Sequence, residues 1–319
     1  MFLQQSPSEC LKFFSIHVAI KGIIKLLMEN KSLYFVGLSK NCFKTLKKNL
    51  NFLKEFKAYS EYKIYIFIID SDSNDGTKKF CEELKKDKTI DEFIEMDNLS
   101  DRYQSRIEKL VLCRNEGLNQ IKKKFNGPSL FLPMDMDMDL FKFMDNKKFN
   151  NLLKYFIEGE IDALFPFSIP YYYDIFALRK KGWVSGNNVN KADVLKRNII
   201  LGSFFINYFY IFRKQYSPNK FRNNLIDVES AFGGMAMYKI SKSEMLEDAY
   251  KWDDQDSRKV CEHIFFNALF NKKFILKSWN IETPKEHNNF NPLKLSNKFL
   301  YFLSTIKYDL RHLKDRILL

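Results

Sequence analysis

The sequence predicts an α/β protein with a mixed, mainly parallel β-sheet flanked by helices, and with helical extensions at both ends of the chain. Short apolar runs alternate with longer segments whose apolar residues recur at helical spacing. Two of the apolar runs end directly in groups of aspartates, as strands often do at the ligand-binding edge of a parallel sheet. With 319 residues, 45% of them hydrophobic and 29% charged, the chain is large enough for one substantial globular domain.

The first half of the chain carries the regular alternation. Strands are expected at 33–38, 62–69, 92–96 and 129–134, and helices at 41–56, 78–86 and 102–125. Because each pair of successive strands is separated by a helix, the strands are expected to run parallel.

The second half is less regular. We expect a helix at 146–157, a strand at 162–167, an irregular stretch to about 198, a strand at 229–240, a helix at 257–270 and a strand at 273–277. The run 199–212 is apolar but is interrupted by Gly202, Ser203 and Asn207, and it falls short of the ~18 apolar residues of a membrane span. It is interpreted as core or as the wall of a site.

Three parts of the chain follow from this pattern: an N-terminal helical extension (1–32), a main domain (33–290) and a C-terminal basic amphipathic helix (291–319). Both ends mix apolar residues with lysines and arginines, so they suit either packing on the main domain or peripheral contact with a membrane surface. The expected location is cytoplasmic.

Composition argues against several classes of protein. With 11 glycines and no G-x-G or Gly-Lys-Ser/Thr sequence, the chain lacks the dinucleotide and P-loop fingerprints. The four histidines and five cysteines form no zinc motif and no C-x-x-C, which argues against a zinc site or a disulfide framework. The net charge of +13 fits anionic partners or a bias toward lysine in the sequence as a whole.

Two acidic clusters follow predicted strands. The first comprises Asp70, Asp72 and Asp75, and the second comprises Asp135, Asp137 and Asp139. Carboxylates two residues apart in an extended segment point the same way. Asp135 and Asp137, or Asp137 and Asp139, are therefore candidate ligands of Mn²⁺ or Mg²⁺, with water and phosphate completing the coordination.

Arginines lie between the two clusters. Arg102 and Arg106 are one turn apart on the expected helix 102–125, and Arg114 lies further along it. Arginine makes bidentate bonds to phosphate and stacks on bases, so this helix suits a nucleoside diphosphate.

The order of the motifs resembles that of the nucleotide-sugar-dependent glycosyltransferases of the GT-A fold. The motifs of the first half are Gly37-Leu-Ser-Lys-Asn41, Ile69-Asp-Ser-Asp-Ser-Asn-Asp-Gly-Thr77, Arg114-Asn-Glu-Gly-Leu118 and Phe131-Leu-Pro-Met-Asp-Met-Asp137. Each is weak alone, but their order is fairly specific.

Motifs of the second half extend the resemblance to fungal capsule-type mannosyltransferases and related microbial transferases. They are Tyr172-Tyr-Asp-Ile-Phe-Ala-Leu-Arg179 with Gly182-Trp183, Ala231-Phe-Gly-Gly-Met-Ala-Met-Tyr238 and Cys261-Glu-His-Ile-Phe-Phe-Asn267. The similarity covers roughly residues 35–277.

The resemblance implies a role for each matched residue. Asp70 would bind the ribose or base in a turn shaped by Ser73 and Asp75, and Arg106 and Arg114 would lie near the nucleotide.

In the second cluster, Asp135 and Asp137 would hold nucleotide and metal. Because Asp139 continues the same spacing, the metal pair is either Asp135 and Asp137 or Asp137 and Asp139. Gly233 and Gly234 would let backbone N–H groups approach the sugar or acceptor. Glu262 would be the base that deprotonates the acceptor in an inverting reaction, although the acidic pair usual in the family is here Glu262-His263.

The function predicted is thus metal-dependent transfer of a sugar from a UDP- or GDP-linked donor to a hydroxyl of a glycan or lipid-linked glycan, in the synthesis of surface polysaccharide or glycoconjugates. No nucleic-acid partner is expected. Two alternatives stay open: a sugar nucleotidyltransferase of similar fold, and a non-catalytic membrane- or polyanion-binding protein. The sequence identifies neither the sugar, the acceptor nor the stereochemical course.

Overall fold

The computed structural model describes residues 31–198, 202–216, 221–252 and 260–284, together with 302, 303, 306 and 309. The expected extensions 1–32 and 291–319 therefore lie almost entirely outside the described residues, as does the start of the expected helix 257–270. Among the described residues, no helix is both long and apolar enough to cross a membrane.

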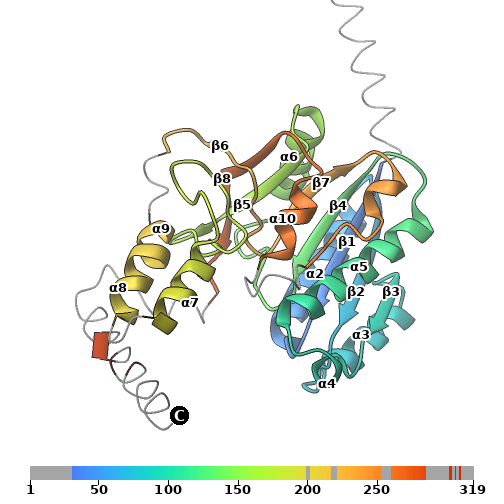
Figure 1. The fold of residues 1–319 in the computed structure, drawn as a ribbon. Helices are drawn as coiled ribbons and strands as arrows, with labels where there is room; N and C mark the ends of the chain where they lie inside the picture. The colour runs from blue at the N-terminus through green and yellow to red at the C-terminus, as the bar shows by residue number, and fades with distance from the viewer. Residues whose placement is uncertain are drawn as a thin grey trace, which may run out of the picture.

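A single mixed sheet forms the centre of the described chain (Figure 1). Its eight strands stand in the order β3-β2-β1-β4-β7-β5-β8-β6. Their bounds are β1 Ser32–Ser39, β2 Lys63–Asp70, β3 Glu92–Glu95, β4 Ser129–Asp135, β5 Ala163–Ile169, β6 Leu225–Asp227, β7 Met237–Ile240 and β8 Lys273–Glu282. Only β6 and β7 pair antiparallel to their neighbours. The predicted mixed, mainly parallel sheet is confirmed.

The order of the strands creates a switch point between β1 and β4. From β1 the chain moves outward to β2 and β3, and it then returns to place β4 on the other side of β1. Ser39 at the end of β1 pairs with Asp70 at the end of β2, and Leu38 pairs with Asp135 at the end of β4. Both acidic clusters therefore begin at the same edge of the sheet, where ligands bind in open α/β sheets.

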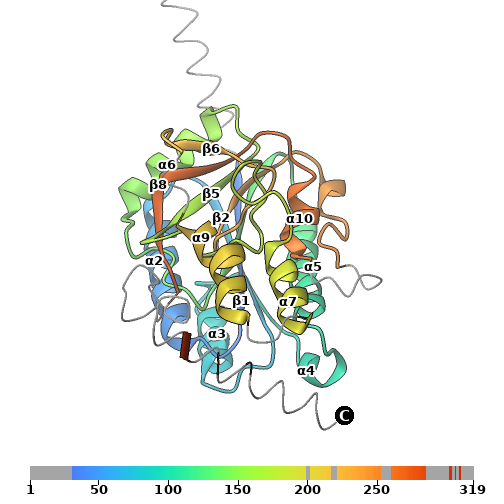
Figure 2. The same ribbon diagram turned by 60° about the vertical axis from the view of Figure 1, so that its left-hand side comes forward.

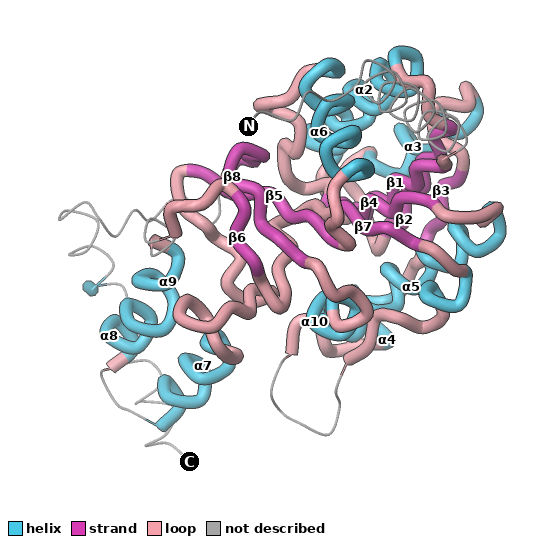
Figure 3. Tube along the Cα trace, turned by 90° about the horizontal axis from the view of Figure 1, so that it is seen from above, coloured by secondary structure: helices cyan, strands magenta, loops and turns pink. Residues whose placement is uncertain are grey.

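Helices cover both faces of this sheet (Figure 3). On one face lie α2 (Phe43–Tyr59), α3 (Thr77–Lys86) and α6 (Asn146–Glu158), and on the other lie α5 (Arg106–Lys124) and α10 (Glu262–Asn267). Each face has its own cluster of buried apolar side chains. The helices form because their apolar residues recur on one stripe, as Leu46, Leu50 and Leu53 do in α2.

The helix expected at 102–125 is in fact two helices. Helix α4 (Leu99–Arg102) ends at an extended Tyr103, and α5 begins after Ser105, whose hydroxyl accepts a hydrogen bond from the Glu108 N–H at 3.4 Å. The Ser-x-x-Glu spacing is typical of a helix N-cap, which the spacing of apolar residues alone does not indicate. Arg102 and Arg106 therefore do not lie one turn apart on a common helix.

The strand expected at 229–240 is also shorter than predicted. Only Met237–Ile240 forms β7, because Gly233 and Gly234 have φ angles of +79° and +92°, and these positive angles make a turn. The expected helix at 257–270 is described only as α10. Strand β6 was not predicted.

The expected irregular stretch ends in helices instead. Helix α7 (Asn188–Asn198) is followed by α8 (Ser203–Asn207), the π-helix η1 (Tyr208–Phe212) and α9 (Arg213–Gln215). The run 199–212 was expected to be core or a site wall. Phe205 and Phe209 do not belong to the core, since their exposed fractions are 56% and 50%.

Candidate active site

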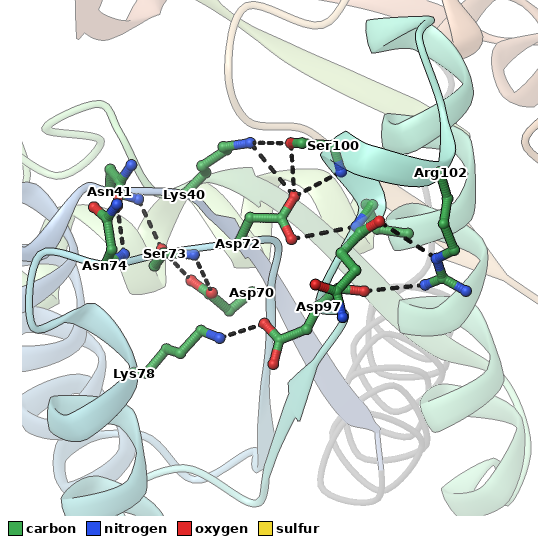
Figure 4. Close-up of polar contacts among 12 residues, drawn as sticks. Lys40, Asn41, Asp70, Asp72, Ser73, Asn74, Lys78, Asp97, Ser100 and Arg102 are labelled. Atoms are coloured by element: carbon green, nitrogen blue, oxygen red, sulfur yellow. Dashed lines mark hydrogen bonds and ion pairs between the residues drawn. The ribbon is translucent and has the colours of Figure 1, made fainter.

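The first acidic cluster is built into the protein. Asp70 is fully buried. Its Oδ2 accepts hydrogen bonds from the hydroxyls of Ser39 (2.8 Å) and Ser73 (2.6 Å), and its Oδ1 accepts one from the Ser73 N–H (3.0 Å). Figure 4 shows Asp70 beneath this turn, and the N–H of Asn41, in the loop after β1, donates to the Ser73 hydroxyl at 2.7 Å. Asp70 thus stabilises the turn, and its contact with a nucleoside stays a prediction.

The other two carboxylates of this cluster also have partners in the protein. Asp72 accepts hydrogen bonds from the N–H groups of Leu99 and Ser100 and lies 3.6 Å from the Lys40 ammonium (Figure 4). Partial burial would raise the pKa of Asp72, but hydrogen bonds from the Ser100 hydroxyl and N–H, together with the charge of Lys40, hold it below its usual value. Asp75 accepts hydrogen bonds from the Thr77 hydroxyl and the Phe43 N–H, and so caps the start of two helices.

The second cluster begins at the last residue of β4. Met136 is fully buried against Gly37, where a Cβ atom would come within 2.7 Å of the Met136 Cγ. Glycine at position 37 therefore leaves room for Met136 and turns the flanking Asp135 and Asp137 away from the core. A turn follows at once, so the extended alternation predicted for Asp135, Asp137 and Asp139 does not continue past Asp135.

The three aspartates consequently separate. Asp139 pairs with Lys48 of α2, with its Oδ2 2.7 Å from the ammonium nitrogen. Asp137 is exposed, and Asp135 is about one-third exposed and meets Arg114 through Oδ1 alone. This geometry favours Asp135 and Asp137 over Asp137 and Asp139 as the metal pair.

The described residues contain no group of three or more histidine, cysteine or acidic side chains that could hold a metal ion by itself. Two carboxylates nevertheless suit Mg²⁺ or Mn²⁺ in a site completed by water and phosphate, since Mg²⁺ is usually bound in this way. The predicted metal site thus depends on the donor's diphosphate for the rest of its ligands.

Arg114 links the second cluster to Glu262. Its Nη2 donates to Asp135 Oδ1 at 3.0 Å, and its Nε donates to Glu262 Oε1 at 2.9 Å. The guanidinium is almost fully buried, at 4.9 Å from the Phe232 ring centroid. Burial alone would lower the pKa of Arg114, but Asp135 and Glu262 raise it above the ordinary value. Arg114 therefore remains charged and holds two carboxylates together.

Glu262 stands at the start of α10 with 3% of its surface exposed. Its second oxygen, Oε2, has the Cys261 thiol 3.6 Å away. A thiol is a weak donor, so Oε2 is the atom that retains capacity to accept a proton. The prediction that Glu262 is the base stays open, and the structure adds Arg114 as its neighbour.

His263 packs as a buried aromatic ring. It stacks on Phe232 with the ring centroids 3.6 Å apart, and neither of its nitrogens has a hydrogen-bond partner among the described residues. Burial, reinforced by Arg114, lowers the pKa of His263 well below 6.5. The imidazole is therefore neutral near pH 7.

Gly233 and Gly234 serve packing in ways the sequence did not predict. The Gly233 N–H donates to Asp174 Oδ2 at 2.8 Å, so this amide is used within the protein. A Cβ on Gly234 would lie 2.3 Å from the Met138 sulfur, and the Gly234 carbonyl accepts a hydrogen bond from the Asp135 N–H at 2.8 Å. Both glycines thus fix the end of β4, which carries the second cluster.

Two residues that shape the site were not predicted from the sequence. Asp174 orders the glycine turn, and its only sign in the sequence was a carboxylate inside an aromatic stretch. Asn115 exchanges two hydrogen bonds with the Tyr250 backbone and locks α5 to the loop before α10. Arg106 is exposed at the start of α5, close enough to Asp135 to oppose the rise that burial causes in its pKa.

A cavity of about 550 Å³ lies elsewhere, between α6 and β8. Its lining includes Phe143, Tyr155, Trp279 and Asn280, and none of the predicted site residues.

No protein-family model matches the chain, and no curated protein matches its sequence. Solved structures do. The S. aureus TarS 1–349 structure matches with a TM-score of 0.43 at 12% identity, over 87% of this chain and 65% of that chain. Mannosyltransferase PcManGT from Pyrobaculum calidifontis, in complex with GDP-Man and Mn²⁺, matches with a TM-score of 0.44 at 12% identity, over 80% and 57%.

Glucosyl-3-phosphoglycerate synthase from Mycobacterium tuberculosis, in complex with Mn²⁺, UDP and glucosyl-3-phosphoglycerate, matches with a TM-score of 0.37 at 10% identity, over 88% of this chain and 83% of that chain. These matches are to GT-A glycosyltransferases at low sequence identity. Because the TM-scores are below 0.5, we base the function of the site on its own geometry. The link to fungal capsule-type enzymes stays a prediction.

Proposed function

We propose that this chain is a metal-dependent glycosyltransferase that moves a sugar from a nucleoside-diphosphate sugar to a hydroxyl of a glycan or glycolipid. The observation that carries the proposal is the bridge from Asp135 through Arg114 to Glu262, at the switch point of the sheet. It joins the place where a diphosphate would be held to a carboxylate that could act as a base.

The charge of this site supports a cation. In the bridge itself, Asp135 and Glu262 bring two negative charges against the single positive charge of Arg114, so a surplus of negative charge remains. A divalent ion would balance that surplus, with Asp135 and Asp137 as its protein ligands. When bound, such an ion neutralises the charge that develops on a diphosphate leaving group.

Glu262 would act on the acceptor. A sugar hydroxyl is a poor nucleophile and needs a base within hydrogen-bond reach as it attacks the anomeric carbon. Arg114 fixes Oε1 of Glu262, which leaves Oε2 to take the proton of the hydroxyl. Arg114 is thus a positioning residue, and direct attack by the deprotonated hydroxyl would invert the anomeric configuration.

The two alternatives fit less well. A sugar nucleotidyltransferase would want a glycine-rich triphosphate loop after β1, whereas Lys40 there donates to Ser100 and pairs with Asp72. A protein that only binds polyanions gains nothing from a site with surplus negative charge. Peripheral membrane contact through the basic ends and a cytoplasmic location also stay predictions, because those ends lie outside the described residues.

Donor hydrolysis tests the proposal. The purified chain would be incubated with a panel of UDP- and GDP-sugars in Mn²⁺, in Mg²⁺ and in chelator. We expect metal-dependent release of UDP or GDP from at least one donor, lost in Asp137→Ala and retained in Glu83→Ala, which removes an exposed carboxylate on α3. Release that persists in chelator, or in Asp137→Ala, would overturn the proposal.

A further inference from the structure

The helices that follow the irregular stretch form an aromatic lobe, defined here as residues 188–198 and 202–216. It comprises α7, α8, η1 and α9, which lie together beyond β6 and β8 (Figures 1 and 2). Half of the ten exposed large hydrophobic side chains of the described residues belong to this lobe or to the C-terminal residues beside it. They are Val194, Phe205, Phe209, Phe302 and Leu303.

The exposed rings form one continuous surface. Phe205 and Phe209 are four residues apart, so they project from the same side of α8 and η1. Phe204 meets Phe205 edge to face at 5.3 Å and Phe302 at 5.4 Å, and it stacks at 6.4 Å on Tyr208, which meets Phe209 edge to face at 5.4 Å. Phe205 and Phe209 are each at least half exposed, although most aromatic side chains of the described residues lie in the core. A soluble protein rarely leaves so much apolar surface in contact with water unless something binds there.

The charge of the segment that carries these rings indicates what binds. From 188 to 216 the sequence carries Lys191, Lys196, Arg197, Arg213 and Lys214, with Asp193 as the single acidic residue. Asp193 is paired with Lys196 at 2.8 Å, and the segment 188–216 carries five basic residues against this one acidic residue. Basic residues beside exposed aromatic rings are the composition of segments that lie in the headgroup region of an anionic membrane.

We propose that the aromatic lobe docks on an anionic phospholipid surface, with Phe205 and Phe209 inserted among the lipids. Such contact needs no spanning helix, and the described residues contain none. The proposed occupant is a membrane surface. Phe302 and Leu303 belong to the expected C-terminal segment 291–319, whereas Phe205 and Phe209, the rings proposed to insert, belong to the lobe.

The lobe is rigidly connected to the candidate active site. The Trp183 indole donates to the Lys214 carbonyl at 2.7 Å, and the Gln215 amide donates to the Tyr173 carbonyl at 3.0 Å. Asp174, the next residue, holds the Gly233 turn at the end of β4. If the proposed function holds, a lobe on the membrane would keep the site near a lipid-linked acceptor.

Vesicle sedimentation tests the docking. We expect the wild-type chain to pellet with vesicles of phosphatidylglycerol and phosphatidylcholine, and to pellet far less with phosphatidylcholine alone or in high salt. Phe205→Ser/Phe209→Ser should lower the partition coefficient at least ~10-fold, because each inserted ring contributes apolar burial. Phe143→Ser/Tyr155→Ser, which removes two exposed rings beside α6, is the matched control and should bind as the wild type does.

Equal binding by the two double variants, or no binding by the wild type, would overturn the proposal. So would self-association of the wild type in solution that Phe205→Ser/Phe209→Ser abolishes while vesicle binding is unchanged, since a second copy would then cover the rings. Melting curves of all variants establish that they are folded.

Donor hydrolysis without vesicles separates this proposal from the proposed function. Phe205→Ser/Phe209→Ser should hydrolyse donor in solution as the wild type does. If no donor is hydrolysed but vesicle binding depends on the two rings, the catalytic proposal falls and the membrane surface stands.

Discussion

The two acidic clusters look alike in sequence and differ in the structure. Each follows a parallel strand at the same edge of the sheet, and each spaces its carboxylates two or three residues apart. In the first cluster, both oxygens of Asp70 accept hydrogen bonds from hydroxyl and amide donors of the chain itself. In the second, Asp137 is exposed and Asp135 shares one oxygen with Arg114. A carboxylate buried in a turn and a carboxylate exposed at a strand end differ in burial, which a linear pattern does not show.

The largest effect is expected at the second cluster. Asp137→Ala should lower sugar transfer at least ~10³-fold, the scale of losing an electrostatic stabiliser of the transition state. Stability should be unchanged because the side chain is exposed. Initial rates with the donor identified by hydrolysis would measure the loss. An active Asp137→Ala enzyme would remove the functional difference between the clusters.

At the other end of the Arg114 bridge, Glu262→Gln should lower kcat ~10²-fold or more, as loss of a general base does. The amide keeps an oxygen for the Arg114 Nε, so nucleotide affinity should be nearly unchanged. Steady-state kinetics and NMR of the product anomer measure both parts of this prediction. A product that retains the donor's configuration, or near-wild-type turnover, would exclude Glu262 as the base.

At the first cluster, the effect should fall on stability. Asp70→Ala leaves two hydroxyls and an amide without their acceptor in a fully buried turn, at a cost of about 3 kcal/mol in the free energy of unfolding. Urea unfolding measures this, with Asp72→Ala as the more exposed comparison. A fully stable Asp70→Ala chain that binds nucleotide more weakly would return Asp70 to the nucleoside role.

His263 makes a smaller contribution, which depends on pH. Burial lowers the pKa of His263 in the folded chain, so the unfolded chain binds the proton first as the pH falls below 6.5. Stability should therefore fall below pH 6.5 by about 1.4 kcal/mol per pH unit, and His263→Leu should lack that slope. Urea unfolding at pH 7.5 and 5.5 compares the two chains; parallel losses would show that His263 is not responsible.

The smallest effect is expected at Asp139. Its carboxylate pairs with Lys48 on the surface of α2, so Asp139→Ala should change transfer by a few fold at most. The same assay as for Asp137→Ala measures it. A loss as large as that of Asp137→Ala would instead make Asp137 and Asp139 the metal pair.

Most strands of the sheet and most helices beside it could be predicted, because apolar residues recur with a different period in strands and in helices. The division of 102–125 into α4 and α5 was missed because an N-cap at Ser105 interrupts a continuous apolar stripe. The turn after Asp135 was missed because aspartate and methionine alternate there as in a strand. The Arg114 bridge to Glu262 joins residues 148 positions apart, and only the fold brings them together.

Calorimetric titration of UDP and GDP with and without Mn²⁺ tests the central claim most directly, namely that the second cluster and not the first holds the metal and diphosphate. We predict nucleotide binding that requires Mn²⁺, that is lost in Asp137→Ala and that persists in Asp72→Ala, provided that each variant melts as a folded protein. Binding that is unaffected by Mn²⁺ and by Asp137→Ala would contradict it.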